Sequence, residues 1–199
     1  MIDHKHKFIF VHIPKCGGCS IGKKFRGSKN TSVIDHNIRN KNFEYLKDKV
    51  AEGLEGYVFT FSRNPWDRLV SAYFYLNQGG NGVRDEIDYD RYLSHYSSFE
   101  DMVLNWNDIL FNQIHFKEQY KWICDSNGEL IPDFIGKTEN LQEDFNTVCD
   151  KIGIPQQQLP HVNKSKHKHY TEYYDEETKQ IVAEKYAKDI EYFGYEFGG

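Results

Sequence analysis

Residues 7–20 read KFIFVHIPKCGGCS, a short apolar run that ends at a proline, a lysine and two adjacent glycines. A nearly continuous apolar run of this length predicts a strand over residues 7–13 that is buried on both faces. A second run, YVFTFS at residues 57–62, is also followed closely by a proline. Weaker strand candidates are TSVID at residues 31–35 and DFIG at residues 133–136.

Helical patterns lie between and after these runs. Apolar residues step by four, three and four on a helix that Gly153 and Pro155 end, namely Leu141, Phe145, Val148 and Ile152. Asp175 caps a last predicted helix, whose inward residues are Ile181, Val182, Ala183, Tyr186 and Ile190. Strands alternating with helices predict an α/β fold with a central parallel sheet flanked by helices. We find no repeat or linker, so one domain is expected over residues 1–199.

The composition narrows the class of protein. Of the 199 residues, 39% are apolar and 28% are charged, which excludes a disordered chain and a membrane protein. The net charge of −5 disfavours a nucleic-acid partner. The polar start MIDHKHK precedes an apolar run too short for a signal peptide or a membrane anchor, so we expect a soluble, cytoplasmic protein. Four cysteines are too few for a disulfide scaffold, and reduced thiols are expected.

Ligands of parallel sheets collect at the carboxyl ends of the strands, where two polar segments stand out. After the first strand, the glycine pair and the start of a short helix near residue 21 bring backbone N–H groups close to a ligand. Lys15 adds a full positive charge. The segment therefore predicts a site for a phosphate-like anion, although it lacks the nucleotide P-loop pattern. A plain glycine turn beside a solvated lysine is the alternative.

The second strand leads into a predicted helix. Asn64 suits its N-cap, Pro65 its first position and Asp67 its first turn. Arg63 then stands at the carboxyl end of the strand, and its planar fork suits a second phosphate, with Ser71 two turns into the helix. In the alternative, Arg63 pairs with an acidic neighbour and Ser71 is merely packed. Two anion sites after neighbouring strands suit a ligand with phosphates at two positions.

The segments FVHIPKCGGCS (residues 10–20) and FTFSRNPWDRLVSAYFY (residues 59–75) resemble the two 3′-phosphoadenosine-5′-phosphosulfate (PAPS) binding segments of the carbohydrate sulfotransferase family. Later stretches at residues 133–154, 159–165 and 173–197 are similar to that family in the same order, and residues 78–110 are the least similar part. The resemblance implies a sulfotransferase fold of the P-loop nucleotide hydrolase type. It also implies transfer of a sulfuryl group from PAPS to an acceptor hydroxyl, on a carbohydrate, without a metal.

The resemblance assigns roles to residues. The 5′-phosphosulfate would be held by Lys15, Gly17, Gly18, Cys19 and Ser20, and the 3′-phosphate by Arg63 and Ser71, while Lys164 and Ser165 would close over the nucleotide. Lys15 would also neutralise the departing phosphate. His36, in the segment DHNIR, is the expected base, with His115, Glu118 and Glu139 in reserve. The family usually has threonine where this chain has Cys16 and Cys19, and a thiol is the weaker donor.

Other functions compete with this interpretation. Cys16 and Cys19 form a C-x-x-C pair at a helix start, as in thiol redox proteins. The same phosphate loops would serve a phosphotransferase-type enzyme that binds ATP with Mg²⁺. A zinc site would need Cys16 and Cys19 as ligands together with Cys124 and Cys149, or with His161, His167 and His169. The spacing of these residues is unusual for a zinc site. Residues 161–169 would suit a polyanion or a solvated loop.

Several side chains are expected to be structural. Core packing is favoured for Trp66, Trp106 and Trp122 over stacking on a sugar. His12, inside the first strand, is expected to be a core histidine. The alternative to a catalytic role for His36 is that it is a surface histidine near a strand end. Residues 77–96 are expected to form a long loop that shapes the acceptor side.

Overall fold

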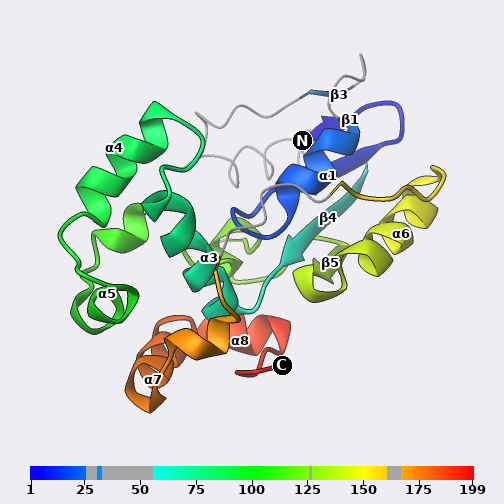
Figure 1. Cartoon of the computed structure of the whole chain (residues 1–199). Helices are drawn as coiled ribbons and strands as arrows, with labels where there is room; N and C mark the ends of the chain where they lie inside the picture. The colour runs from blue at the N-terminus through cyan, green and yellow to red at the C-terminus, as the bar shows by residue number, and fades with distance from the viewer. Residues whose placement is uncertain (26–30, 33–55, 126, 161–166) are drawn as a thin grey trace. The chain divides into compact units, whose positions relative to one another are not determined.

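The computed structural model describes residues 1–25, 31–32, 56–125, 127–160 and 167–199 (Figure 1). Contacts between residues divide the chain into two compact units. Unit 1 comprises Met1–Ser62 and Gln119–Asn163, and unit 2 comprises Arg63–Glu118 and Lys164–Gly199. The expectation of a single domain over residues 1–199 stays a prediction.

Unit 1 is built on a five-stranded sheet with the order β3-β1-β2-β4-β5. Its parallel part consists of β2 (Phe8–Val11), β4 (Tyr57–Ser62) and β5 (Phe134–Lys137). Two short strands, β1 (Ile2–Asp3) and β3 (Thr31–Ser32), pair antiparallel at one edge. The α/β fold with a central parallel sheet is therefore confirmed. The sheet is mixed, however, because the polar start of the chain contributes β1, which no local pattern predicts.

The parallel register brings the ends of the predicted strands together. Val11 of β2 lies opposite Thr60 of β4, and Ser62 of β4 lies opposite Lys137 of β5. All four residues of β2 are buried, as are the last five of β4, so the sheet centre is buried on both faces. The carboxyl ends of the three strands share one edge, and the Lys15 segment follows β2 there.

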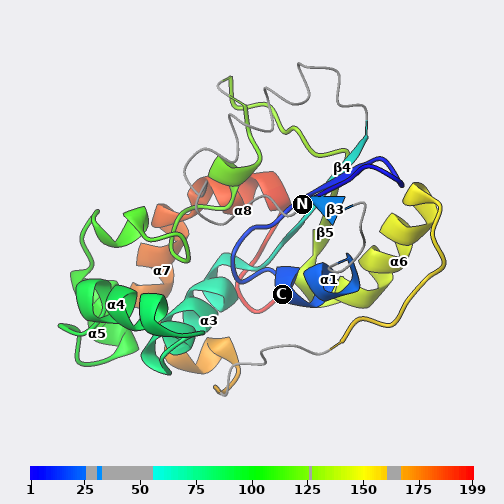
Figure 2. The same cartoon turned by 90° about the horizontal axis from the view of Figure 1, so that it is seen from above.

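Two helices cover one face of this sheet, α1 (Gly18–Phe25) and α6 (Leu141–Ile152). The ring of Phe25 lies 4.7 Å from that of Phe8 on β2 and 6.0 Å from that of Phe145 on α6, measured between centroids. Figure 2 shows both helices on the same side of the strands. The predicted helix over residues 141–152 is confirmed, and it ends at Gly153, whose left-handed φ of 71° suits glycine.

Unit 2 is helical. Its helices are α3 (Pro65–Asn77), α4 (Val83–Tyr92), α5 (Phe99–Asn105), α7 (Glu176–Lys185) and α8 (Ala187–Phe193). Single 3₁₀ turns occur at η2 (Leu110–Asn112) and η5 (Tyr170–Tyr173) in this unit, and at η3 (Tyr120–Trp122) and η4 (Thr138–Asn140) in unit 1. Among the described helices, none is long and apolar enough to span a bilayer.

The core of unit 2 forms around α3, which buries Leu69, Val70 and Leu76 against aromatic side chains of the later helices. Trp66 and Trp122 are buried, at 4% and 5% exposure, as expected of core residues. Trp106 is only partly buried, and its ring contacts that of Phe111 at 5.1 Å. The tryptophans therefore serve packing.

Two expectations about helices need correction. The predicted last helix is divided into α7 and α8 at Tyr186, whose backbone leaves helical geometry at φ −106° and ψ 25°, while its hydroxyl donates to the carbonyl of Phe116 at 2.7 Å. Asp175 does cap α7, in a capping box with Thr178. Residues 77–96 are not a long loop, because α4 lies within them. That helix buries none of its residues, so its sequence shows little apolar periodicity.

Candidate functional site

The segment after β2 turns sharply before α1 begins. Lys15 has a φ of 71° and Gly17 a φ of 73°, both in the left-handed region. Between them, the N–H of Cys16 donates to the carbonyl of Ile13 at 3.3 Å and closes the turn. A lysine in this conformation carries backbone strain, and strain of this kind clusters at ligand sites.

The two glycines are needed for different reasons. Gly17 supplies the positive φ, whereas Gly18 makes room for a neighbour. A Cβ on Gly18 would lie 2.0 Å from Cδ2 of His12, far inside contact distance. The His12 ring itself stacks on Phe10, with centroids 5.9 Å apart. His12 lies just beyond β2 and not inside it, is only partly buried, and places its ring against the first turn of α1.

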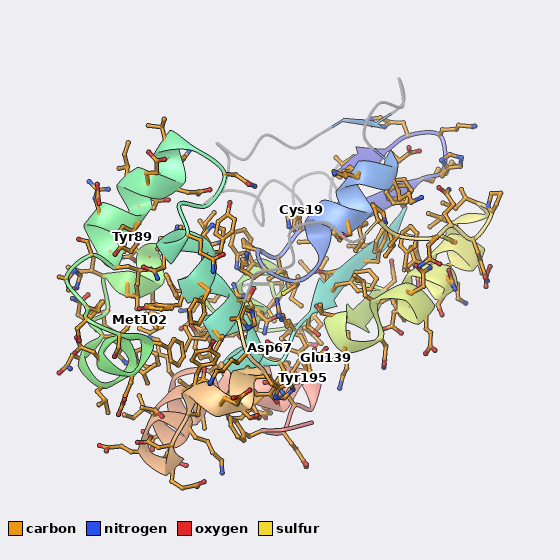
Figure 3. The ribbon with its side chains drawn as sticks, in the orientation of Figure 1. Cys19, Asp67, Tyr89, Met102, Glu139 and Tyr195 are labelled. Atoms are coloured by element: carbon orange, nitrogen blue, oxygen red, sulfur yellow. The ribbon has the colours of Figure 1, made fainter. Side chains whose placement is uncertain are left out.

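The first turn of α1 presents backbone donors. Within the described residues, the N–H groups of Gly17, Gly18 and Cys19 have no hydrogen-bond acceptor, while the N–H of Ser20 donates to the carbonyl of Gly17 at 3.0 Å. The turn contains no acidic side chain, and Cys19 lies half-buried on it (Figure 3). Consecutive N–H groups at a helix start, with Lys15 beside them in sequence, can hold an anion.

The two cysteines of this segment differ in their surroundings. Cys16 is 1% exposed, and its thiol donates to the side-chain oxygen of Gln119 at 3.2 Å. Cys19 is half-buried on α1. All four cysteines lie in the described part of the chain, and no disulfide joins them. Because the Cys16 sulfur is hydrogen-bonded to an amide, the redox interpretation gains no support from this geometry.

The segment after β4 opens unit 2. Asn64 caps α3, with its side chain accepting from the N–H of Trp66 at 3.2 Å, and Pro65 occupies the first helical position. The Nε of Arg63 donates to Oδ2 of Asp67 at 2.8 Å. This is the acidic neighbour that the alternative interpretation of Arg63 expected, and Asp67 also lies in the first turn of the helix as predicted. The helix prediction over this segment is confirmed.

Ser71 lies one turn beyond Asp67 on the same face of α3. Its side chain is 2% exposed, and its hydroxyl has no hydrogen-bond partner among the described residues. A hydroxyl can donate and accept, so a ligand oxygen would give it a partner. The arrangement along α3 thus offers a guanidinium at the helix start and a hydroxyl two turns on.

Arg68, which we did not single out in the sequence, is fully buried in unit 2. Its Nη1 donates to the carbonyl of Lys117 at 2.9 Å. Burial raises the pKa of Tyr186 far above its ordinary range, and the positive charge of Arg68 opposes that shift. Tyr186 therefore stays neutral at all ordinary pH values. The buried pattern of α3 marks Arg68 as structural, although no local signal separates it from Arg63.

The reserve bases have structural surroundings. Oε1 of Glu118 lies 3.9 Å from Nζ of Lys185 in a mostly buried ion pair. The His115 ring packs edge-on against that of Tyr75, with centroids 5.1 Å apart. Glu139 lies in η4, at the start of α6 (Figure 3). These surroundings give none of the three residues more support than His36 as the general base.

The predicted site residues are described to different extents. Unit 1 contains Lys15, Gly17, Gly18, Cys19 and Ser20. Unit 2 contains Arg63, just before α3, and Ser71, two turns into that helix. Three predicted residues, His36, Lys164 and Ser165, lie outside the described residues. That the two segments bind one ligand stays a prediction. Among the described residues, no three His, Cys, Asp or Glu side chains are grouped as in a metal site.

A family model and two named relatives point to one family. A sequence model of the sulfotransferase family matches residues 1–196. Human carbohydrate sulfotransferase 9 is 26% identical over 219 aligned positions, which cover 95% of this chain and 47% of that protein. Zebrafish (Danio rerio) carbohydrate sulfotransferase 14 is 23% identical over 188 positions, covering 78% of this chain and 48% of that protein. This chain thus spans about half the length of these two relatives.

Two further matches come from an archaeon and from a solved structure. An uncharacterized protein of Archaeoglobus fulgidus is 32% identical over 129 residues, which cover 63% of this chain and 92% of that protein. The crystal structure of mouse sulfotransferase SULT7A1 complexed with PAP aligns with a TM-score of 0.44 and 14% identity, over 95% of this chain and 86% of that one. Because the family match extends over nearly the whole sequence, the chain belongs to the sulfotransferase family.

Proposed function

We propose that this protein transfers a sulfuryl group from PAPS to a hydroxyl of a carbohydrate acceptor. The observation that carries the proposal is the turn between β2 and α1. Three consecutive N–H groups, of Gly17, Gly18 and Cys19, have no acceptor among the described residues, and they follow a lysine held at a φ of 71°. This turn supplies directional donors for the 5′-phosphosulfate of the donor substrate.

The second segment supplies the groups for the 3′-phosphate. Arg63 follows Ser62 directly, at the carboxyl end of the strand next to β2. We assign the 3′-phosphate to the Arg63 guanidinium and the Ser71 hydroxyl, and we assign closure over the nucleotide to Lys164 and Ser165. A donor that carries phosphates at two separate positions would use both groups of residues.

The reaction breaks the bond between the sulfur and the bridging oxygen of the phosphosulfate, and it forms a bond from sulfur to the acceptor oxygen. The departing phosphate gains negative charge, which Lys15 and the N–H groups of the turn stabilise. The acceptor hydroxyl loses its proton to a base, for which we assign His36. The protein thus aligns the partners and stabilises charge, and the residues assigned here include no metal ligand.

Support for a carbohydrate acceptor comes from the two relatives named carbohydrate sulfotransferases, one of which matches 95% of this chain. Transfer of radiolabelled sulfur from PAPS to a panel of neutral and charged oligosaccharides would identify the acceptor. Transfer to none of the oligosaccharides, with transfer to a small phenol or amine instead, would contradict this part of the proposal.

Calorimetric titration tests the donor separately. The purified protein is titrated with 3′,5′-adenosine bisphosphate in the presence of EDTA, and with ATP in the presence of Mg²⁺. We expect tight binding of the bisphosphate without metal and weak binding of ATP. The opposite pattern would favour a phosphotransferase and would remove the proposal.

A further inference from the structure

A hydrogen bond between residues far apart in the sequence anchors the turn before α1. The thiol of Cys16 donates to Oε1 of Gln119 at 3.2 Å, and the two residues are 103 positions apart. Both belong to unit 1, with Cys16 1% exposed and Gln119 completely buried. The same sulfur lies 3.7 Å from the carbonyl of Pro14, which begins the turn.

Gln119 is itself well anchored. It forms the N-cap of the single turn η3, where its carbonyl accepts from the N–H of Trp122 at 3.0 Å. Trp122 is 5% exposed, so its ring fixes this short element in the core. A buried amide must have its polar atoms satisfied, and the Cys16 thiol satisfies the oxygen. Gln119 therefore acts as a rigid acceptor for a residue of the turn.

The position of Cys16 gives this contact a consequence for binding. Cys16 stands between Lys15 and Gly17, the two residues with left-handed backbone, and directly before the N–H groups of Gly17, Gly18 and Cys19. A strained turn keeps its conformation only when its surroundings over-determine it. With the Cys16 side chain hydrogen-bonded to Gln119, the backbone on either side of it stays in the form that leaves these N–H groups without an acceptor among the described residues.

We propose that Gln119 is a positioning residue for the donor-binding turn and that it acts through Cys16. The inference rests on the proposed function, because the turn must bind the donor for its shape to matter. Gln119 does not touch the donor in this scheme. Gln119 preorganises the turn. Without Gln119, the ligand must order the turn when it binds, and the free energy of binding becomes less favourable.

A double-mutant cycle tests the contact. The variants are Gln119→Met, Cys16→Ala and the double variant, with Cys16→Ser as the conservative variant that keeps a donor. The dissociation constant for 3′,5′-adenosine bisphosphate is measured by calorimetry, and KM for PAPS and kcat by sulfate transfer. Cys149→Ala, which removes a buried thiol in α6, is the matched control for loss of packing.

The expected result is a weakening of bisphosphate binding by about fivefold in each single variant, which is the size of one net hydrogen bond. KM for PAPS rises by the same factor and kcat changes little. The double variant binds no more weakly than either single variant, and Cys16→Ser binds like the wild type. Cys149→Ala has a lower melting temperature but unchanged affinity.

Two failures are distinguishable. If the wild type does not bind the bisphosphate, the proposed function is wrong. If the wild type binds and Gln119→Met binds equally well, or if the two single effects multiply in the double variant, the positioning role is overturned. Should Gln119→Met not fold, the comparison of Cys16→Ala with Cys16→Ser decides, because equal affinities of these two variants would also overturn it.

Discussion

Arg63 donates through Nε to Oδ2 of Asp67, at 2.8 Å and one helical turn away, on the first turn of α3. Both side chains are mostly buried, at 18% and 22% exposure. The Asp67 carboxylate interacts favourably with the positive N-terminal end of the helix dipole. It also orients the Arg63 guanidinium. The ion pair therefore belongs to the same small group of residues as Asn64 and Pro65, which begin the helix.

Replacing Arg63 with alanine tests its assigned role. We expect Arg63→Ala to weaken binding of 3′,5′-adenosine bisphosphate by at least about tenfold, since a charge-assisted hydrogen bond contributes about 1.5–3 kcal/mol. Stability should change little, because Asp67 keeps its favourable place at the helix start. Arg84→Ala, at an exposed position on α4, is the control for loss of one positive charge. Equal affinity of both variants in calorimetry would remove Arg63 from the site.

Ser71 and Thr60 are two buried residues that carry a hydroxyl, and they form a matched pair. The hydroxyl of Thr60 donates to the carbonyl of Val11 at 2.8 Å, whereas that of Ser71 has no partner among the described residues. We expect Thr60→Val to lower the free energy of unfolding by about 1 kcal/mol. Ser71→Ala should leave stability unchanged and weaken bisphosphate binding about fivefold or more. Urea unfolding and calorimetry measure the two effects, and a stability loss in Ser71→Ala without an affinity loss would contradict the assignment.

The contact between His12 and Gly18 predicts a coupled pair. A Cβ on Gly18 would lie 2.0 Å from the His12 ring, so Gly18→Ala should destabilise the protein by about 1–3 kcal/mol through overpacking. Removing the ring in the double variant His12→Ala/Gly18→Ala should recover part of that loss. Urea unfolding of both single variants and the double variant measures the coupling. Additive losses would mean that the two residues do not meet as described.

The cysteine pair separates sulfate transfer from redox chemistry. We expect the double variant Cys16→Thr/Cys19→Thr to keep sulfotransferase activity, because backbone N–H groups and not thiols are assigned to the phosphosulfate. Cys19→Thr alone should bind the bisphosphate somewhat more tightly, since a hydroxyl is a better donor than a thiol. A thiol redox protein would lose its activity in both variants. Sulfate transfer and an insulin-reduction assay, run on the same preparations, distinguish the two outcomes.

His36 is tested by splitting turnover from binding. We expect His36→Ala to lower kcat by about 100-fold or more, as for loss of a general base, while the affinity for the bisphosphate stays the same. Unchanged turnover would return the role to the reserve residues, of which His115 would be tested next.

Much of the fold could be predicted because its signals are local. The predicted strand at residues 57–62 coincides with β4, and the helix that Asn64 and Pro65 predict is α3. Caps, turns and apolar periodicity act over a few neighbouring residues, and here they agree with the final packing. Gly17 has a positive φ, which glycine adopts without strain.

Other features lay beyond any local pattern. The strand β1 depends on pairing with β2 and β3, and α4 buries none of its residues, so neither shows a clear periodicity. Position 18 requires glycine because the ring of His12, six residues earlier, occupies the space of a side chain. The sequence does not distinguish this requirement from the need for a positive φ.

By itself, the sequence determined the strand β4 and the helices α3 and α6, and which residues of the two polar segments carry charge or N–H donors. Those properties follow from covalent chemistry and near neighbours. Only the tertiary structure decided that Cys16 meets Gln119 across 103 residues, and that Ser71 is left with a hydroxyl that no described residue bonds. Such contacts depend on how whole elements pack against one another, because packing joins residues by shape and not by their order along the chain.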